Sequence, residues 1–145
     1  MKLRTLVLST AISLLSASAA LSATVSVFKD AACGCCGGWI AHMRANGFTV
    51  AAADISPEQM DVVKAKAGIT SDTASCHTAL VDGYVVEGHV PASDVQRLIT
   101  ERPDAVGLAA PGMPSGSPGM EGAGLEPYDV LLIKRDGRTE IFASH

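Results

Sequence analysis

Hydrophobic and polar residues alternate in short runs along the first third of the chain. Residues 24–28 alternate and are rich in β-branched side chains, which predicts a first strand. Residues 39–44 carry apolar side chains at helical spacing and are followed by Asn46-Gly47, which predicts a helix that ends there. Residues 48–55 predict a second strand. The order in this part of the chain is therefore strand, helix, strand.

The middle of the chain begins with a helix start signal. In residues 56–59 a Ser can cap the helix, a Pro takes its first position and a Gln closes a capping box, and the helix is expected to end at Gly68. Residues 78–81 and 84–86 predict two strands, which the hairpin dipeptide Asp82-Gly83 joins. A third helix is expected to start at residues 91–94 and to end before Pro103.

The resulting order β-α-β-α-β-β-α predicts an α/β, thioredoxin-like fold. It is followed by a Gly/Pro/Met-rich loop over residues 107–127 and by an added C-terminal β-hairpin over residues 128–142, with Asp136-Gly137 at its centre. In such a fold the loop before the third strand lies over the start of the first helix. We therefore expect Ser75-Cys76-His77-Thr78 to face the junction between the first strand and the first helix.

The N-terminus predicts export. Lys2 and Arg4 precede an uncharged stretch and a run of small residues that suits a signal peptidase, so residues 1–23 are interpreted as a secretory signal peptide. A retained membrane anchor is the weaker interpretation, because the apolar run is short and is interrupted by Ser and Thr. Residues 24–145 would then form one metal-binding domain in the periplasm, with no membrane attachment after cleavage.

Composition narrows the classes of partner. The chain has 145 residues, a mean hydropathy of +0.28 and a net charge of −4. Removal of the signal peptide leaves nine basic against fifteen acidic residues, a net charge of −6. No cluster of Lys or Arg occurs, and aromatic residues make up only 4% of the chain. We therefore expect no nucleic-acid partner, because such proteins need basic patches and stacking surfaces.

Four cysteines carry the chemistry: Cys33, Cys35, Cys36 and Cys76. An exported protein tends to form disulfides, and four cysteines allow three connectivities. Three of them are too close in sequence to join distant parts of the chain, so at most one bridge, from this group to Cys76, is expected. With Cys76 facing the other three, the four thiols would form one site. Helix N-terminal amides predict lowered thiol pKa values, and converging thiolates suit Cu(I), Zn(II) or an iron–sulfur cluster.

Methionine favours copper among these metals. Met113 and Met120 lie in the Gly/Pro-rich stretch, where they cannot fill a core as helical methionines do. Thioether combined with thiolate in an exported protein favours Cu(I) over zinc. The predicted metal-binding residues are therefore the four cysteines, His77 beside Cys76, and these two methionines. His77 could equally satisfy backbone groups of its loop.

The remaining histidines and apolar residues have structural interpretations. His89 precedes Pro91 at a helix entrance, where a capping role or an indirect role behind a metal ligand is expected. His42 is interpreted as a surface residue of the first helix, and His145 as a frayed terminal residue. Packing in the core is expected for three further residues, Trp39, Met43 and Met60.

The motifs also resemble a known family, the domain-of-unknown-function family numbered 411, whose best-known members are the CopG-type periplasmic copper-resistance proteins. The matching segments are residues 33–39 (CGCCGGW), 75–79 (SCHTA), 88–91 (GHVP), 107–114 (GLAAPGMP), 117–121 (SPGME) and 128–130 (YDV). The resemblance covers nearly all of the chain after the signal peptide. It implies a thioredoxin-like fold in which Cys33, Cys35, Cys36 and Cys76 hold a multinuclear, thiolate-bridged Cu(I) cluster, with a redox role in copper tolerance.

Two functions from different classes remain open. The first is a copper-binding protein for copper resistance and homeostasis that sequesters or buffers Cu(I), with cycling of copper between oxidation states as an added activity and no catalytic residue assigned. Its partners would be copper ions and other periplasmic copper-handling proteins. The second is an exported thiol–disulfide oxidoreductase, because Cys33 and Cys36 form a Cys-x-x-Cys motif at a helix start. The extra thiols Cys35 and Cys76 favour the metal. A structural zinc site is a third, weaker interpretation, which leaves the methionines unexplained.

Overall fold

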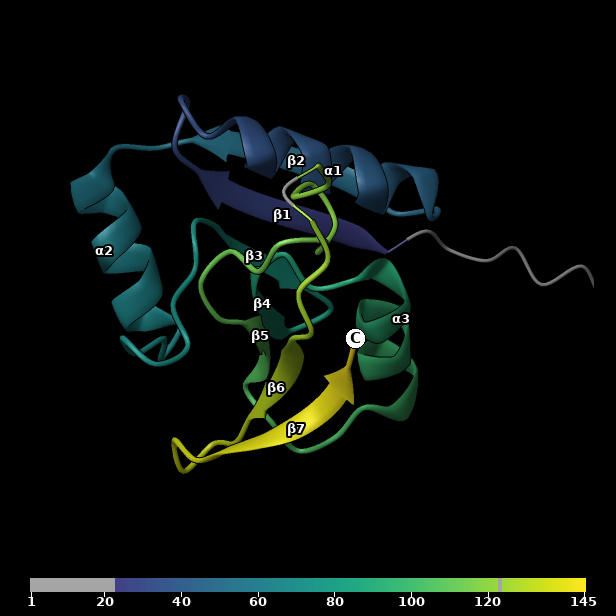
Figure 1. The fold of residues 1–145 in the computed structure, drawn as a ribbon. Coiled ribbons are helices and arrows are strands. Elements are labelled where there is room, and N and C mark those ends of the chain that lie inside the picture. Colours follow the sequence, from purple (N-terminus) through teal and green to yellow (C-terminus); the bar gives the residue numbers. More distant parts are fainter. Residues whose placement is uncertain (1–22, 123) are drawn as a thin grey trace, which may run out of the picture.

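The computed structural model describes residues 23–122 and 124–145, which form one mixed α/β unit with a single sheet (Figure 1). Its elements are β1 (Thr24–Lys29), α1 (Gly34–Ala45), β2 (Thr49–Asp54), α2 (Pro57–Lys66), β3 (Thr78–Val81), β4 (Tyr84–Gly88), α3 (Ala92–Glu101), β5 (Gly107–Ala110), β6 (Asp129–Ile133) and β7 (Thr139–Ser144). The predicted signal peptide, residues 1–23, lies outside the described residues except for Ala23. No helix within the described ranges has the length and apolar character that a membrane crossing requires.

The sheet has the strand order β2-β1-β3-β4-β5-β6-β7. Strands β1 and β2 are parallel, as are β4 and β5, and the other neighbours are antiparallel. The parallel pairs are connected through α1 and α3, as parallel pairing requires a crossover. Strands β1 and β3 are neighbours in this order, so the end of β1 and the start of β3 meet at one edge of the sheet: Phe28 pairs with Thr78.

Helices α1 and α3 cover one face of the sheet, and α2 lies on the other. The backbone N–H of Ala92 donates to His42 Nε2 at 3.0 Å, and Gln96 Nε2 donates to the carbonyl of Asn46 at 3.1 Å, so α3 is joined to α1. Successive side chains of a strand point to opposite faces. In β4, Val86 belongs to the main core, whereas the neighbouring Glu87 contacts Lys64 of α2.

Most predicted elements before residue 103 are present. The capping box of α2 forms as expected: Gln59 N–H donates to Ser56 Oγ at 3.3 Å, and Ser56 N–H donates to Gln59 Oε1 at 2.9 Å. Asp82 and Gly83 both have positive φ values, 49° and 86°, which is the conformation of a tight two-residue hairpin turn. Trp39 is fully buried and donates from Nε1 to the carbonyl of Val90 at 2.8 Å, so its predicted core position is confirmed.

The interpretation of residues 107–127 as one loop is wrong for its first four residues. These form β5, a fully buried strand between β4 and β6. A Cβ at Gly107 would lie 1.8 Å from the carbonyl oxygen of Val85, so the close pairing of β4 and β5 requires glycine here. The strand was not predicted because glycine and alanine have low strand propensity. In the fold, burial between β4 and β6 outweighs this low propensity.

The added hairpin is confirmed as β6 and β7, which form the far edge of the sheet. The prediction that His145 is frayed is wrong. Its backbone pairs with Tyr128 in both directions, at 2.9 and 3.2 Å, and its Nε2 lies 2.8 Å from Asp94 Oδ2 of α3. Arg97 of α3 also stacks on Phe142 of β7, with its guanidinium 3.6 Å from the ring centre. The C-terminal strand is therefore attached to α3 by side chains as well as to β6.

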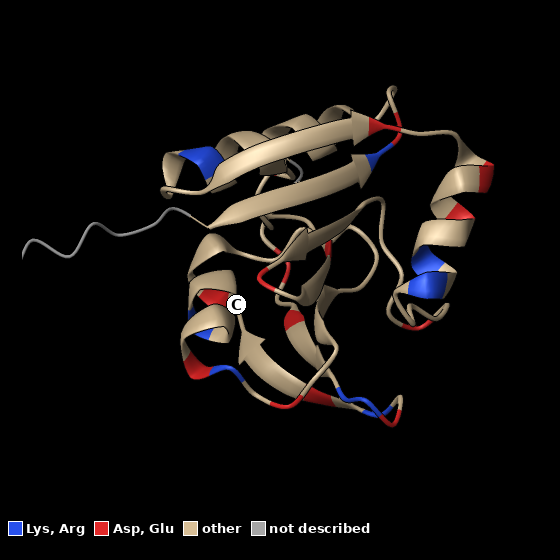
Figure 2. Cartoon of the chain, turned by 180° about the vertical axis from the view of Figure 1, so that it is seen from behind, with Lys and Arg blue, Asp and Glu red and all other residues tan. Residues whose placement is uncertain are grey.

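Charged residues are scattered over the helices, strands and turns of the fold (Figure 2). Lys and Arg occur at separate places on α1, α2, α3 and the β6–β7 turn, with Asp and Glu between them. Several basic side chains are paired with acidic ones, as in Lys29–Asp54 and Lys134–Glu140. Acidic and basic residues are thus interspersed along the described part of the chain.

Candidate metal and redox site

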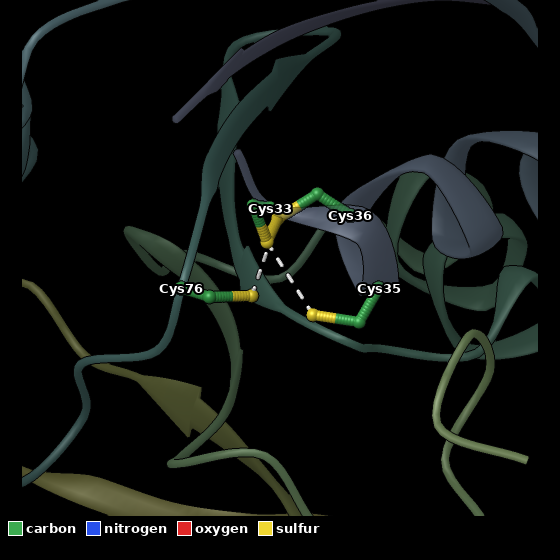
Figure 3. A group of neighbouring side chains, drawn as sticks. All are labelled: Cys33, Cys35, Cys36 and Cys76. Atoms are coloured by element: carbon green, nitrogen blue, oxygen red, sulfur yellow. Dashed lines mark hydrogen bonds between the residues drawn. A yellow bond between two sulfur atoms is a disulfide. The ribbon is translucent and has the colours of Figure 1, made fainter. Parts of the chain in front are cut away.

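The four cysteines meet at the N-terminus of α1, as the sequence predicted. Cys33 is the N-cap residue of α1, and Cys35 and Cys36 lie in its first turn. Cys76 arrives from the segment before β3, and all four Sγ atoms lie within 4.8 Å of one another (Figure 3). The predicted contact across forty residues is confirmed: Cys36 Sγ and Cys76 Sγ are 3.5 Å apart.

A disulfide joins Cys33 to Cys36, while Cys35 and Cys76 carry free thiols. The expectation that a bridge would lead from the group to Cys76 is therefore wrong. The reason is local geometry: the first turn of α1 brings the Cα atoms of Cys33 and Cys36 to 5.5 Å, a normal separation for a disulfide. Both free thiols remain in contact with the bridge, since Cys35 Sγ lies 3.3 Å from Cys33 Sγ.

Three contacts position the segment that carries Cys76. Ser75 N–H donates to Glu87 Oε1 at 2.7 Å, and Ser75 Oγ donates to the carbonyl of Gly112. Glu87 is fully buried, where it pairs with Lys64 and accepts a hydrogen bond from Thr78 Oγ1 at 2.6 Å. A buried carboxylate with a full set of partners is a rigid support. The segment that carries Cys76 is thus held through Ser75 by Glu87, and Glu87 is in turn paired with Lys64 of α2.

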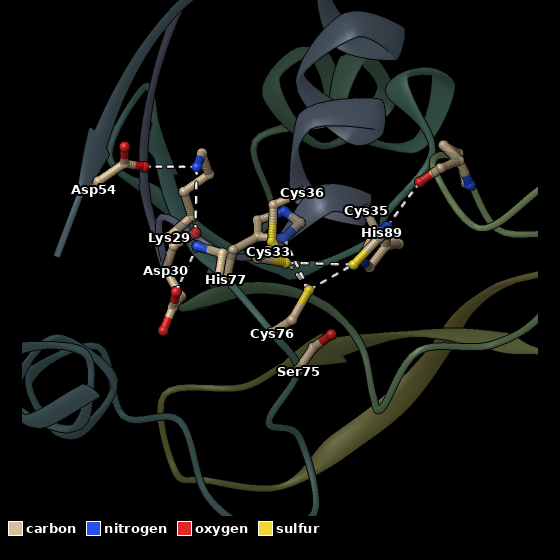
Figure 4. The surroundings of a disulfide bond; sticks show 12 residues. Lys29, Asp30, Cys33, Cys35, Cys36, Asp54, Ser75, Cys76, His77 and His89 are labelled. Atoms are coloured by element: carbon tan, nitrogen blue, oxygen red, sulfur yellow. Dashed lines mark hydrogen bonds and ion pairs between the residues drawn. A yellow bond between two sulfur atoms is a disulfide. The ribbon is translucent and has the colours of Figure 1, made fainter. Parts of the chain in front are cut away.

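His77 and His89 surround Cys76, and both are fully buried (Figure 4). Cys76 Sγ lies 3.3 Å from His77 Nδ1 and 3.0 Å from His89 Nε2. His77 packs on Trp39, with ring centres 4.5 Å apart, and its Nε2 has no hydrogen-bond partner among the described residues. His89 was expected to act only indirectly. Its direct contact with Cys76 is the main feature of the site that the sequence interpretation missed.

Burial dominates the electrostatics of this group. It lowers the pKa of His77 to about 3, with smaller contributions from the charges of His89 and Lys64, and it also lowers the pKa of His89. Burial, followed by the nearby Cys35, raises the pKa of the Cys76 thiol. The expected lowering of thiol pKa values is therefore wrong for Cys76, because this thiol lies in the facing segment and not in the first turn of the helix.

The methionine-containing segment packs against the same region. Gly112 N–H donates to the carbonyl of Ala74 at 2.9 Å, so Gly112 lies beside the loop that carries Cys76. Met113 is the next residue, and its side chain is 53% exposed. Met120 follows Gly119, whose backbone lies on the first turns of α1. Both methionines are thus carried by segments that adjoin the cysteines, and their role as ligands stays a prediction.

A pocket of about 210 Å³ lies between the β1–α1 loop and α2, and Cys76 is among its lining residues. Ser75 also lines it, and so do Lys64, Met60 and two carboxylates, Asp30 and Asp61. Met60 is buried and lies 3.9 Å from Thr78 Oγ1, so its expected packing role is confirmed.

Comparison with known proteins finds one matching family and two similar solved structures. The family described as "Protein of unknown function, DUF411" matches residues 73–120. A solved structure described as "Copper resistance protein copG- Form 2" is 45% identical, with a TM-score of 0.79, and the match covers 86% of this chain and 98% of that chain. A second, "Copper resistance protein copG- Form 1", is 46% identical with a TM-score of 0.79, covering 84% and 96%. No curated protein sequence matches the chain.

Proposed function

Because this chain belongs to the family of the copper resistance protein CopG, we propose that it binds copper as cargo on the cysteine cluster at the start of α1. The observation that carries the proposal is the convergence of four Sγ atoms within 4.8 Å of one another. Thiolates are soft ligands that select Cu(I), and sulfurs at this spacing can bridge several ions. The proposed cargo is a multinuclear Cu(I) cluster on Cys33, Cys35, Cys36 and Cys76.

Copper loading in this form requires reduction of the Cys33–Cys36 disulfide. Two electrons and two protons from an external thiol reductant convert the bridge into two thiols, and the reductant becomes oxidised. The pocket beside Cys76 offers access. Binding then replaces the thiol protons by copper, which overcomes the raised pKa of Cys76 because a coordinating thiol is deprotonated by the metal.

Met113, Met120 and His77 complete the proposed site. Thioethers in a segment next to the cysteines would pass Cu(I) to the thiolates or extend the ligand set. His77 Nδ1 already contacts Cys76 Sγ at 3.3 Å. The wider proposal is a periplasmic protein of copper resistance and homeostasis, exported by the signal peptide at residues 1–23 and formed by one domain over residues 24–145. It would exchange copper with other copper-handling proteins of that compartment.

The fold proposed for this domain is thioredoxin-like. The strand order β2-β1-β3-β4, with α1 and α3 on one face and α2 on the other, supports it. In this interpretation β5, β6 and β7 extend the sheet. The segment between β5 and β6 brings Met113 next to the Cys76 loop and Met120 next to α1.

A thiol–disulfide oxidoreductase is the second candidate, and the Cys33–Cys36 disulfide favours it. The thiolate of a substrate or of Cys76 would attack one sulfur of the bridge, form a new disulfide and release the other sulfur as a thiolate. Cys76 Sγ is 3.5 Å from Cys36 Sγ, within reach of that step. For Cys76 as attacking group the product is a Cys36–Cys76 bridge and a Cys33 thiolate.

One pair of assays on Cys76→Ser separates the two functions. Copper binding predicts that the reduced variant holds fewer Cu(I) ions per chain, because one of four bridging sulfurs is missing. An oxidoreductase predicts that reduction of a disulfide peptide by Cys33 and Cys36 continues in the variant. The matched control is Ser71→Ala, an exposed serine whose hydroxyl donates to the neighbouring Asp72, and it should change neither result. Unchanged copper stoichiometry in Cys76→Ser would contradict the proposed site.

A further inference from the structure

Strand β2 (Thr49–Asp54) forms one edge of the sheet and is open along its outer side. It pairs with β1, and within the described residues no other strand pairs with it. Figure 2 shows β2 as the uppermost strand, with α1 behind it and charge only at its end, where Asp54 lies. All of its residues are exposed except Val50, which is half-buried. An open edge of this kind can pair with another strand.

The hydrogen bonds toward β1 fix which backbone groups of β2 turn outward. Thr49 and Ile55 donate their N–H groups to carbonyls on the β1 side, at 3.2 and 2.9 Å. Residues along a strand turn their backbone groups alternately toward one side of the strand and toward the other. The residues whose N–H and C=O groups point away from β1 are therefore Val50, Ala52 and Asp54.

The strand lacks the usual protection of a sheet edge. Edge strands are commonly protected by lysine or proline residues or by a bulge. The sequence of β2 has neither lysine nor proline, and its pairing with β1 runs without a bulge. Among the outward groups of this described strand, the carbonyl of Val50 alone has a partner, Arg44 of α1 at 3.1 Å. A carbonyl oxygen has two lone pairs, so it can accept a second hydrogen bond while Arg44 stays.

Strand β2 is complementary to a second copy of itself. In an antiparallel arrangement centred on Ala52, the two Ala52 residues pair with each other, and Val50 pairs with Asp54 of the second copy. In an antiparallel ladder every second pair of opposed residues exchanges hydrogen bonds, which matches the outward turn of these residues. This register uses every outward group of the strand. We propose that the protein forms a symmetric dimer by antiparallel pairing of β2 with β2 of a second copy.

The charges near the ends of β2 match in this register. Val50 lies opposite Val25 of the main core, so Val50 and Asp54 turn their side chains toward the face that α1 covers. Arg44 reaches the edge from the same face. It would lie beside Asp54 of the second copy, whose side chain is 56% exposed although it pairs with Lys29 of its own chain. The symmetry of the dimer forms this ion pair twice.

The neighbouring side of α1 has room for the second copy. Gly37, Ala41 and Arg44 are spaced by one and two helical turns, so they share the side of α1 that overhangs the edge of β2. Gly37 and Ala41 are exposed, and a Cβ at Gly37 would meet no atom within 4 Å. Nothing in the described chain thus requires glycine here, and glycine inside a helix is destabilising relative to alanine. Close approach of α1 from the second copy would use these small residues.

The dimer would leave the cysteine site accessible. Strands β1 and β2 are parallel, so the two β1 strands of the dimer would run in opposite directions. The cysteines follow the end of β1, and the two sites would therefore lie at opposite ends of the joined sheet. The proposal goes beyond the copper function and does not depend on it. A contact of one strand and one side of a helix is small, so the dimer should be weak.

The test measures the mass of the chain without its predicted signal peptide by sedimentation at rising concentration. A thiol reductant is present throughout, so that no disulfide between chains contributes. We expect a reversible equilibrium between one chain and two, and slower hydrogen exchange of the Val50, Ala52 and Asp54 amides at high concentration. Ala52→Lys should raise the dissociation constant about tenfold or more, because it adds a charge to the edge. Ala65→Lys adds the same charge on the exposed side of α2 and should leave the constant unchanged.

A second variant tests the charge match. Arg44→Glu would place a carboxylate beside Asp54 of the second copy and should weaken the dimer about tenfold or more. Arg138→Glu is the control, because it makes the same change of charge at an 81% exposed residue of the β6–β7 turn. An unchanged dissociation constant in Arg44→Glu would contradict the proposed register.

Three results would overturn the dimer: a protein that stays monomeric up to millimolar concentration, a dimer that Ala52→Lys leaves intact, or amides of β2 that exchange equally fast at all concentrations. The exchange measurement uses the parent chain, so it decides the matter even where a variant fails to fold. Ala52→Lys should bind as many Cu(I) ions per chain as the parent. A failure of copper binding would therefore contradict the proposed function alone, and a failure of pairing would contradict the dimer alone.

Discussion

Gly119 lies directly on Gly38 of α1: a Cβ at Gly38 would be 2.8 Å from the Cα of Gly119. A Cβ at Gly119 would be 2.6 Å from both the carbonyl oxygen of Cys35 and the backbone nitrogen of Trp39. Two glycines thus allow the segment that carries Met120 to touch the helix that carries the cysteines. This contact holds the methionine-containing segment in place.

The contact predicts the effect of Gly119→Ala. The new methyl group has no room against α1, and φ at this residue is +89°, so the segment must move away. We expect a loss of about 1–3 kcal/mol in the free energy of unfolding, measured with urea, as for other overpacked positions. Gly122→Ala is the matched control, because φ is +102° there but no atom lies within 4 Å of the added Cβ. Equal losses in the two variants would show that the contact with α1 is unimportant.

The buried ion pair behind Cys76 predicts a large effect of Lys64→Met. Glu87 has no exposed surface, so removal of Lys64 leaves a buried carboxylate without its counter-charge. The expected loss is about 3–5 kcal/mol in the free energy of unfolding.

Lys29→Met is its control. The exposed fractions of the two lysine side chains are nearly the same, 15% for Lys29 and 16% for Lys64, but Asp54, the partner of Lys29, is 56% exposed. Removal of such a pair costs about 1 kcal/mol or less. A Lys64→Met variant as stable as Lys29→Met would contradict the supporting role of Glu87.

The low pKa of His77 predicts acid sensitivity of the metal-free protein. Burial lowers this pKa to about 3, whereas the imidazole of the unfolded chain titrates near its ordinary pKa of 6.5. Between these values the unfolded state binds the proton and the folded state does not, so stability falls as pH decreases. Between pH 7 and 5 His77 should contribute a loss of about 1–2 kcal/mol. Urea unfolding of His77→Gln at both pH values should show a smaller loss, and an identical loss would contradict a neutral, buried His77.

The methionine segment predicts a change in copper affinity. Met113→Leu combined with Met120→Leu keeps the apolar volume but removes two thioethers, so Cu(I) should bind more weakly or load more slowly in competition with a chromogenic chelator. Met43→Leu is the control, because this methionine is fully buried in the core. Unchanged affinity and loading rate in the double variant would assign the segment a purely structural role.

Local signals were sufficient for most of the fold and for the meeting of the cysteines. The capping box of α2, the Asp82-Gly83 turn and the strand–helix alternation depend on nearby residues, and these predictions are confirmed. The strand β5 could not be found, because its short Gly-Leu-Ala-Ala sequence is stabilised by burial between β4 and β6. The Cys-x-x-Cys motif marked Cys33 and Cys36 as a redox pair, but the one bridge was expected to lead to Cys76. The observed pairing depends on the turn of α1 that brings Cys33 to Cys36.

The place of His89, in contrast, was available in the sequence. A two-residue hairpin fixes the register of its strands. With Val81 opposite Tyr84, successive pairs lead to Thr78 opposite Glu87, and two further steps place Cys76 beside His89. The observed distance of 3.0 Å between Cys76 Sγ and His89 Nε2 follows from this register. The buried pairing of Glu87 with Lys64 required the packing of α2 and had no comparable signal.

The most direct test of the copper proposal is an anaerobic Cu(I) titration of the fully reduced protein without its signal peptide. Bound copper is counted per chain in competition with a chromogenic chelator, and protein that retains the Cys33–Cys36 disulfide is measured in parallel. The four converging sulfurs predict more than one tightly held Cu(I) per reduced chain and a loss of this binding when the disulfide is intact. Reduced protein that fails to compete with the chelator would contradict the proposal and leave disulfide exchange as the function of the four cysteines.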